Sequence, residues 1–345
     1  MTIHQPSRVN DRLVADIAQA FGLGNVGSVT YLATGLMNRN WRITTQAGEF
    51  ALKQIIDVPV PTARRNLRVL AALNEAGVPA CPPVLTAAGD PVVEVDERGY
   101  CVLPWLDGFH LEGPDLTLAQ AHQLGAVVGR IHESLNHLDP ALGLPPATTR
   151  PTGRVVQPDE AVAEARRYQV LAKEAGGLFD QAVVDLLDQR IALIEKHSTQ
   201  RPATDQPHGP CGWTHGDLQY RNVIWCDGHV GAVIDWDRIR IRPFAEEIAR
   251  TATIQFGNPE GLDLERVAAF VAGYRTIIPI DDAALADGVH RLWWKRMSDF
   301  WHLDFHYDRG DGGCDDLFIS GEALLYWWTG HATEVHTAFT VHATG

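Results

Sequence analysis

The stretch WTHGDLQYRNVIW (213–225) places His215, Asp217 and Asn222 on one short loop between β-prone flanks. An aspartate on a tight loop can point its carboxylate at an incoming hydroxyl group. An asparagine five residues later, just before an apolar strand, can turn its amide oxygen toward a metal ion. The alternative is a turn in which both side chains bond their own backbone. Taken alone, the spacing leaves both interpretations open.

A second motif, GAVIDWD (231–237), delivers Asp235 at the end of another apolar strand. If the residues around 222–236 form a β-hairpin, Asn222 and Asp235 lie side by side at its mouth. A carboxylate and an amide oxygen are suitable ligands for Mg²⁺, which is a hard cation. Asp235 alone could be a strand-end cap, but the pair with its intervening hairpin is much more specific.

Two features near the N-terminus could bind phosphates. The segment EFALKQII (49–56) places Lys53 in a strand, where a lysine on the inner face can reach phosphate groups. An outward-facing lysine on an edge strand is the alternative. Gly35 in ATGLMNRNW (33–41) would let the backbone approach phosphates closely, although one glycine is not specific.

The elements that must position these residues fall into two groups. Residues 1–104 predict a small lobe with an antiparallel sheet and one embedded helix at 63–77, where the apolar residues share one face. Residues 105–345 predict a larger, mainly helical lobe that contains the motifs at 213–237. We expect helices at 8–22, 116–138, 158–176, 179–197, 244–256, 262–276, 283–306 and 319–338, and further strands at 29–34, 40–45 and 49–56.

In this order, the motifs resemble those of the aminoglycoside phosphotransferase and choline kinase family, relatives of the protein kinases. HGDLQYRN resembles the family's catalytic loop, VIDWD stands where protein kinases have D-F-G, and YCVLPWLDG (100–108) resembles the hinge between the lobes. The resemblance covers roughly residues 25–256. It implies an α+β, bilobal, protein-kinase-like fold and a small-molecule kinase that uses ATP or GTP with Mg²⁺.

The resemblance also implies a role for each motif residue. Asp217 would orient the substrate hydroxyl and accept its proton, while Asn222 and Asp235 would hold Mg²⁺. Lys53 would hold the α- and β-phosphates, and His215 would brace the loop. Phosphoryl transfer is catalysed mainly by positioning and charge neutralisation, so these few groups suffice.

Further implied contacts concern the nucleotide. The residues that would bind it besides Lys53 are Gly35 and the hinge residues Val102, Leu103 and Trp105, which would contact adenine through their backbone.

The sequence departs from the family pattern at the lysine's partner. Asn66 stands where the family has a glutamate on the following helix, and Glu75 lies further on. Either the alignment is shifted, or a hydrogen bond replaces the ion pair that holds Lys53. EEIA (246–249) stands where the family often has an aspartate, and Glu247 could substitute in bracing the loop.

Other kinds of site find less support. His302 and His306 have zinc-ligand spacing, but no general-base glutamate lies between them and aromatic residues surround them. The sequence has no G-x-S-x-G motif and no P-loop. An inactive kinase-like binding protein is the non-enzymatic alternative, and the presence of Lys53, Asp217, Asn222 and Asp235 disfavours it.

Composition narrows the partners and the compartment. A net charge of −14, from 29 basic and 43 acidic residues, disfavours a nucleic-acid partner. No apolar run approaches the length of a transmembrane helix and the start does not resemble a signal peptide, so no membrane partner is expected. Five scattered cysteines without a CxxC pair fit a reduced, cytoplasmic protein, either a monomer or a homodimer.

The substrate signal lies in LWWKRMSDFWHLDFHYDRGDGGCDD (292–316). On one continuous helix, Trp294, Met297, Trp301 and Asp304 would form a single stripe, which core packing also explains. Clustered aspartates repel each other, so we predict a pocket for a small cationic molecule, such as an aminoglycoside or a basic cyclic-peptide antibiotic. Its candidate residues are Trp301, Asp304, Asp308, Asp311 and Asp315. The alternative is a metabolic kinase of the same family, like homoserine or choline kinases.

Overall fold

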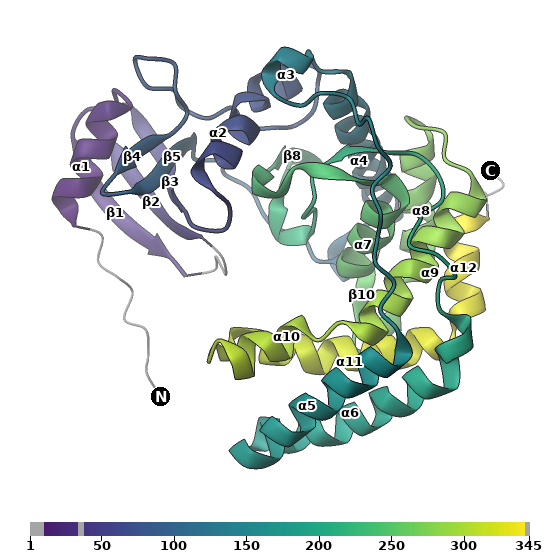
Figure 1. Cartoon of the computed structure of the whole chain (residues 1–345). Coiled ribbons are helices and arrows are strands. Elements are labelled where there is room, and N and C mark those ends of the chain that lie inside the picture. Colours follow the sequence, from purple (N-terminus) through teal and green to yellow (C-terminus); the bar gives the residue numbers. More distant parts are fainter. Residues whose placement is uncertain (1–9, 34–37, 342–345) are drawn as a thin grey trace.

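The computed structural model describes residues 10–33 and 38–341, and its two lobes are visible in Figure 1. The N-terminal lobe contains one antiparallel sheet with the strand order β1-β2-β3-β5-β4. Its strands are β1 (Val26–Leu32), β2 (Arg39–Thr45), β3 (Gly48–Ile55), β4 (Val93–Val95) and β5 (Arg98–Pro104), and its helices are α1 (Asp11–Ala20), α2 (Val60–Arg68) and α3 (Leu70–Glu75).

The two faces of this sheet have different surroundings, as neighbouring side chains of β3 show. Leu52 points to the face that α1 covers, where it packs in a cluster that includes Ile17 of the helix. Successive side chains of a strand point to opposite faces, so Lys53 points away from α1. Lys53 pairs with Asn40 of β2 and Cys101 of β5, and it therefore lies on a central strand and is buried.

The helix predicted at 63–77 is divided into α2 and α3. Its continuity ends at Val69, whose N–H bonds the carbonyl of Asn66, three residues back, in place of a regular α-helical bond. Val69 and Leu70 are fully buried, so the change of direction lets both parts contact the core.

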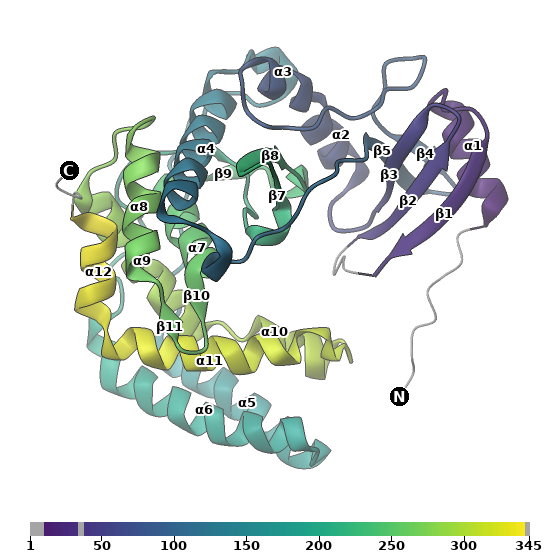
Figure 2. The same cartoon turned by 180° about the vertical axis from the view of Figure 1, so that it is seen from behind.

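The C-terminal lobe is mainly helical (Figure 2). Its helices are α4 (Leu118–His137), α5 (Pro158–Ala175), α6 (Leu178–His197), α7 (Phe244–Phe256), α8 (Leu264–Arg275), α9 (Asp282–Ser298), α10 (Trp301–Leu303), α11 (Asp315–Gly330) and α12 (Ala332–Thr340). Three strand pairs accompany them: β6 (Cys211–Thr214) with β9 (Arg240–Pro243), β7 (Val223–Cys226) with β8 (His229–Val233), and β10 (Gly257–Asn258) with β11 (Gly261–Leu262).

Two layers of helices support the strand pairs. α4 and α8 approach so closely that a Cβ atom at Gly125 would overlap the carbonyl of Phe270. Both views show α5 and α6 side by side as a hairpin along α10 and α11. Within the described part of the chain, no helix is both long enough and apolar enough to span a lipid bilayer.

The prediction of one helix over 283–306 is wrong. α9 ends at Ser298, and α10 and a π-helix at Asp304–Asp308 follow after a break. Arg190 causes the break in part, because its Nη1 donates to the carbonyl oxygens of Arg296, Met297 and Asp299 and satisfies the helix end. Trp294 and Met297 therefore do not share one helical stripe with the residues that follow the break.

Candidate active site

The loop after β6 is held by a buried carboxylate on α7. Glu247 accepts hydrogen bonds from the backbone N–H groups of His215 and Gly216, and from Nε2 of His132 at 2.7 Å. Gly216 has φ +85°, and a Cβ atom there would overlap the carbonyl of Arg238, so only glycine fits. Burial alone would raise the pKa of Glu247, but these hydrogen bonds and the neighbouring histidines lower it to about 2.

His215 connects the loop to the strand pair β7–β8. Its Nδ1 accepts from the backbone N–H of Asp217 at 3.3 Å, and its Nε2 donates to the carbonyl of Ile234 at 3.1 Å. This pattern requires the neutral imidazole, and burial lowers the pKa of His215 in agreement. The side chain is fully buried and its ring lies 4.6 Å from that of Trp236, so these contacts are those of a bracing residue.

Asn222 joins the two motif loops. Its Nδ2 donates to the carbonyl of Asp217 at 2.8 Å, and its own carbonyl accepts from the N–H of Ile234 at 2.9 Å. The residue after Ile234 is Asp235. Asp235 is therefore brought together with Asp217 and Asn222, although it lies on a different loop from those two residues. Among the described residues, none donates a hydrogen bond to Oδ1 of Asn222.

Asp235 has a left-handed backbone, with φ 63° and ψ 59°. This conformation is uncommon for a residue other than glycine and is often found at functional sites. Asn66 holds the turn, because its Nδ2 donates to the carbonyls of Trp236 and Asp237 at 3.0 and 2.6 Å. Asn66 thus positions the backbone next to Asp235 and does not contact Lys53.

Lys53 is held by two carboxylates of the C-terminal lobe. Its Nζ lies 2.6 Å from Oδ1 of Asp235 and 2.7 Å from Oδ2 of Asp237. Burial would lower the pKa of Lys53, but the two negative charges raise it above its ordinary value, and the lysine in turn lowers the pKa of Asp235. An ion pair therefore does hold Lys53, with partners that come from neither Asn66 nor Glu75.

Further contacts tie the lobes together at this place. Nδ2 of Asn38 donates to Oδ2 of Asp237 at 2.9 Å, while its Oδ1 accepts from the N–H groups of Ile56 and Asp57. Arg238 binds Asp57 through two hydrogen bonds of 2.7 Å. The segment that follows Asp235 is thus fixed to the N-terminal lobe from several sides.

The predicted nucleotide-binding residues lie on β5 and just after it. Val102 is buried and its carbonyl accepts from Val84, and Leu103 pairs with Ala51 of β3. The N–H of Trp105 donates to the carbonyl of Glu49, so this amide is already bonded. Gly35 lies outside the described residues. Contacts of these residues with a nucleotide stay predictions.

Asp217 itself is bound by an arginine that the sequence did not suggest. Nη2 of Arg250 donates to its Oδ1 at 2.6 Å, and Gln219 approaches its other oxygen at 3.5 Å. Arg250 is on α7, three residues after Glu247, so one face of this helix reaches both the loop backbone and the carboxylate.

The aspartates of segment 301–316 have partners of their own. Asp308 binds Arg167 through two bonds of 2.9 Å and accepts from Tyr168. The other pairings are Asp304 with Arg309, Asp315 with His306, and Asp311 with the N–H of Gly313. Their role in substrate binding stays a prediction.

Three of the five predicted substrate residues share a pocket of about 580 Å³. Trp301, Asp304 and Asp308 line it, together with residues 153–156, one side of α5 and the end of α9. Glu246 lines it too and lies one turn before Arg250 on α7, the helix that binds Asp217. Asp311 and Asp315 are not among the residues that line it.

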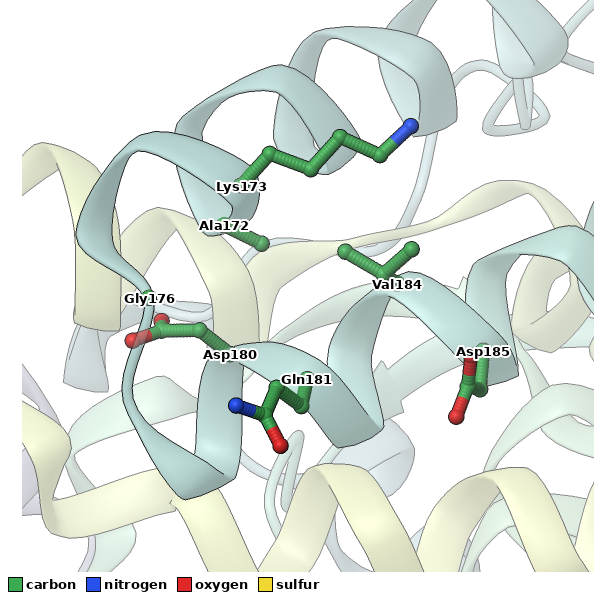
Figure 3. Close-up of a pocket in the computed structure, with 7 residues that line it drawn as sticks. All are labelled: Ala172, Lys173, Gly176, Asp180, Gln181, Val184 and Asp185. Carbon is green, nitrogen blue, oxygen red and sulfur yellow. The ribbon is translucent and has the colours of Figure 1, made fainter.

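A second hollow lies at the tip of the α5–α6 hairpin (Figure 3). Its volume is about 460 Å³, and none of the predicted site residues lines it. Asp180 in its wall accepts from the hydroxyl of Tyr307 and the N–H of Gly177. Nowhere in residues 10–33 and 38–341 do three or more His, Cys, Asp or Glu side chains form a group that could hold a metal, and His302 and His306 form no such group.

Sequence reasoning missed Asp237, Asn38 and Arg250. The second acid of IDWD was a usable signal for Asp237, and the helical spacing from Glu247 was one for Arg250. Nothing in the sequence around Asn38 indicated that it would contact Asp237, because that contact joins two lobes.

The fold and the site define a kinase-like phosphotransferase, and comparisons with known proteins agree. A model of the phosphotransferase enzyme family matches residues 28–285. This is more than half of the chain, which therefore belongs to that family and is a small-molecule kinase. The predicted α+β, bilobal, protein-kinase-like fold is confirmed.

Individual proteins are similar over most of their length. A homoserine kinase of Methylobacillus flagellatus is 23% identical, over 82% of this chain and 83% of that protein. The structure of an amicoumacin kinase in complex with AMP-PNP, Ca²⁺ and Ami has a TM-score of 0.60 at 17% identity, covering 99% of this chain and 98% of the other. The structure of a microcompartment-associated aminopropanol kinase has a TM-score of 0.58 at 18% identity, covering 94% of this chain and 99% of the other. At these identities, the two structures show a shared fold.

Proposed function

We propose that the protein transfers the γ-phosphoryl group of ATP to a hydroxyl of a short hydroxylated amino acid, of which homoserine is the first candidate. The observation that carries the reaction is the joining of the two motif loops at Asn222, which places Asp217 beside Asp235. In the transfer, a bond forms between the acceptor oxygen and the γ-phosphorus. The bond from that phosphorus to the β–γ bridging oxygen breaks, ADP leaves with the electron pair, and the hydroxyl proton passes to Asp217.

Asn222 and Asp235 would hold Mg²⁺, which neutralises charge on the phosphates when bound. The donor set fits, because Oδ1 of Asn222 and Oδ2 of Asp235 receive no hydrogen bond from any described residue. Both are oxygen atoms, as a hard cation requires. Lys53 would hold the α- and β-phosphates, and the backbone near Val102, Leu103 and Trp105 would contact adenine.

Two observations support a hydroxylated amino acid as the acceptor. In segment 301–316, Asp304, Asp308, Asp311 and Asp315 are already bonded to arginine, histidine, tyrosine or backbone groups, with which a polycation would have to compete. In addition, several curated relatives carry the name homoserine kinase. An amino acid with one ammonium and one carboxylate needs fewer acids than an aminoglycoside.

A cationic antibiotic is the second candidate. It is favoured by the pocket of about 580 Å³ lined by Trp301, Asp304 and Asp308, which is larger than homoserine requires. Pockets of this size accommodate drug-sized molecules. For this candidate, the paired aspartates would have to exchange their internal partners for the ammonium groups of the ligand.

A substrate panel tests the proposal. The purified chain is incubated with Mg²⁺ and ATP or GTP and with homoserine, choline or a cationic antibiotic, and ADP or GDP release and the mass of the product are measured. We expect phosphohomoserine with ATP. Phosphorylation of the antibiotic without turnover of homoserine would establish the second candidate instead.

We also propose a division of labour and a compartment. Residues 1–104 would form the nucleotide-binding lobe and residues 105–345 the lobe with the catalytic loop, the metal site and the substrate pocket, in a monomer or homodimer. All five cysteines are free thiols, which supports the cytoplasm as the compartment.

A further inference from the structure

Two buried arginine N–H groups, one of them on the arginine that binds Asp217, have no acceptor among the described residues. Nη1 of Arg250 and Nε of Arg296 are enclosed, and neither finds an acceptor within the described residues. The guanidinium of Arg296 makes no hydrogen bond or ion pair at all with residues 10–33 or 38–341. A buried N–H without an acceptor is unfavourable, so the free Nη1 of the arginine that binds Asp217 indicates a place for an acceptor group of a ligand.

The two arginines are neighbours. Arg250 is on α7 and Arg296 in the last turn of α9, and these helices pack so tightly that Gly288 faces Ala245. Burial, together with the positive charge of Arg250, lowers the pKa of Arg296 to about 10. Two like charges repel, and a bound anion between them would remove the repulsion.

Arg250 is paired with Asp217, whereas none of the described carboxylates is paired with Arg296. Glu246, one turn before Arg250, is bound to Arg242 at 2.8 Å. Glu322 is bound to Arg190. Burial and then the charges of Arg190 and Arg296 lower the pKa of His302 to about 3, so this imidazole remains neutral beside them.

We propose that Nη1 of Arg250 and the guanidinium of Arg296 bind the carboxylate of the acceptor molecule. Arg250 already donates through Nη2 to Asp217, so one planar group would hold the base and the substrate carboxylate at once. Both carboxylates would then be bound to one guanidinium group, which keeps them only a few ångströms apart. This separation fits a hydroxyl and a carboxylate joined by a short carbon chain. The inference rests on the proposed function, because it takes the acceptor to be a hydroxy acid.

The same chemistry could serve an oxyanion from another source, the transferred phosphoryl group. An arginine that binds phosphate would act on the nucleotide, whereas one that binds the acceptor carboxylate would act on the amino acid. The kinetic constants for the two substrates separate these cases.

A binding experiment tests the proposed carboxylate site at Arg250 and Arg296 without turnover. The wild-type chain, with AMP-PNP and Mg²⁺, is titrated calorimetrically with L-2-aminobutanoate, which lacks the hydroxyl, and with propylamine, which also lacks the carboxylate. We expect binding of the first compound only. Arg296→Gln should weaken it about tenfold, the effect of losing one charged hydrogen bond, while the exposed Arg166→Gln should leave it unchanged. Failure of wild type to bind L-2-aminobutanoate, or equal binding of propylamine, would overturn the proposed carboxylate site.

Steady-state kinetics locates the anion. Arg296→Gln should raise KM for homoserine about tenfold and leave KM for ATP unchanged, and Arg296→Lys should recover part of the loss. Its melting temperature should stay the same or rise, because the variant removes a buried unpaired charge, whereas loss of a merely structural arginine would lower it. An increase in KM for ATP alone would assign the arginine to the phosphate.

A decarboxylated acceptor separates the two proposals. If 3-aminopropan-1-ol is phosphorylated with the same efficiency as homoserine, the chain is an amino-alcohol kinase and the proposed carboxylate site is wrong. If wild type phosphorylates neither compound, the proposed acceptor is wrong. The titration with L-2-aminobutanoate still decides for or against the proposed carboxylate site.

Discussion

The loop at 213–222 and the segment at 301–316 both combine aspartate with aromatic residues, yet they hold their carboxylates differently. The backbone around Asp217 is fixed by Glu247, His215 and Asn222, and its carboxylate meets one arginine from a distant helix. In the segment 301–316, Asp304, Asp311 and Asp315 each bond a group at most nine residues away.

This difference separates acids that can do chemistry from acids that shape the chain. A carboxylate whose loop is held by other elements can keep a fixed position, and that of Asp217 is contacted closely by Arg250 alone, with Gln219 at 3.5 Å from its other oxygen. A carboxylate that binds the nearest cation or N–H stabilises its own segment. Asp308 is intermediate, because Arg167 and Tyr168 of α5 bind it and it lines the pocket.

The largest effect should come from Asp217→Asn. Loss of the group that orients the hydroxyl and accepts its proton should lower kcat by about 10² to 10⁴-fold. Binding of ATP, measured by titration with AMP-PNP, should remain close to that of wild type. The matched control is Asp227→Asn in the exposed β7–β8 turn, and near-normal kcat in Asp217→Asn would refute the assignment.

Glu247→Gln should have the next largest effect. The amide replaces one acceptor oxygen by a donor that faces backbone N–H groups, so the loop that carries Asp217 should shift. A small misplacement of this kind lowers kcat by about 10²-fold. Glu265→Gln, an exposed change on α8, serves as control. A normal kcat would show that the loop keeps its position without this brace.

The pH dependence of stability tests the same carboxylate. Glu247 has a pKa of about 2 in the fold against 4.5 in the unfolded chain, so its contribution is complete above pH 4.5 and is lost as the pH falls toward 2. The shift corresponds to about 3 kcal/mol. The difference in free energy of unfolding between wild type and Glu247→Gln, from urea denaturation, should therefore shrink below pH 4.5. A constant difference would argue against the depressed pKa.

The smallest effect should follow neutralisation of the acidic segment. Replacement of Asp311, Asp315 and Asp316 by asparagine removes the negative charge of a partly exposed pair with His306, keeps an acceptor for the N–H of Gly313, and should change stability by about 1 kcal/mol or less. The KM for homoserine should not change. A higher KM for a cationic acceptor would instead place these residues in its pocket.

Particular residues show how far the sequence could be interpreted. Motif order and spacing predicted the fold, and they identified Asp217, Asn222 and Asp235, which the structure brings together. The break at Asp299 was not predictable from periodicity, because the carbonyls at the helix end are bound by the buried Arg190 of another helix. The ion pair of Lys53 with Asp237 was equally hidden, because its members are far apart in sequence and belong to different lobes.

The sequence by itself determined which residue types meet at the loops, because local strand, turn and glycine signals set the spacing of His215, Gly216 and Asp217. Only the tertiary structure decided which charges remain free. Asp304 and Asp315 are bound by neighbours in their own segment, whereas Arg296 finds no partner among residues 10–33 and 38–341. Whether a charged side chain keeps or lacks a partner depends on how the helices pack. Composition cannot predict this, because a cluster of aspartates in the sequence does not show which cationic side chains will lie beside it in the fold.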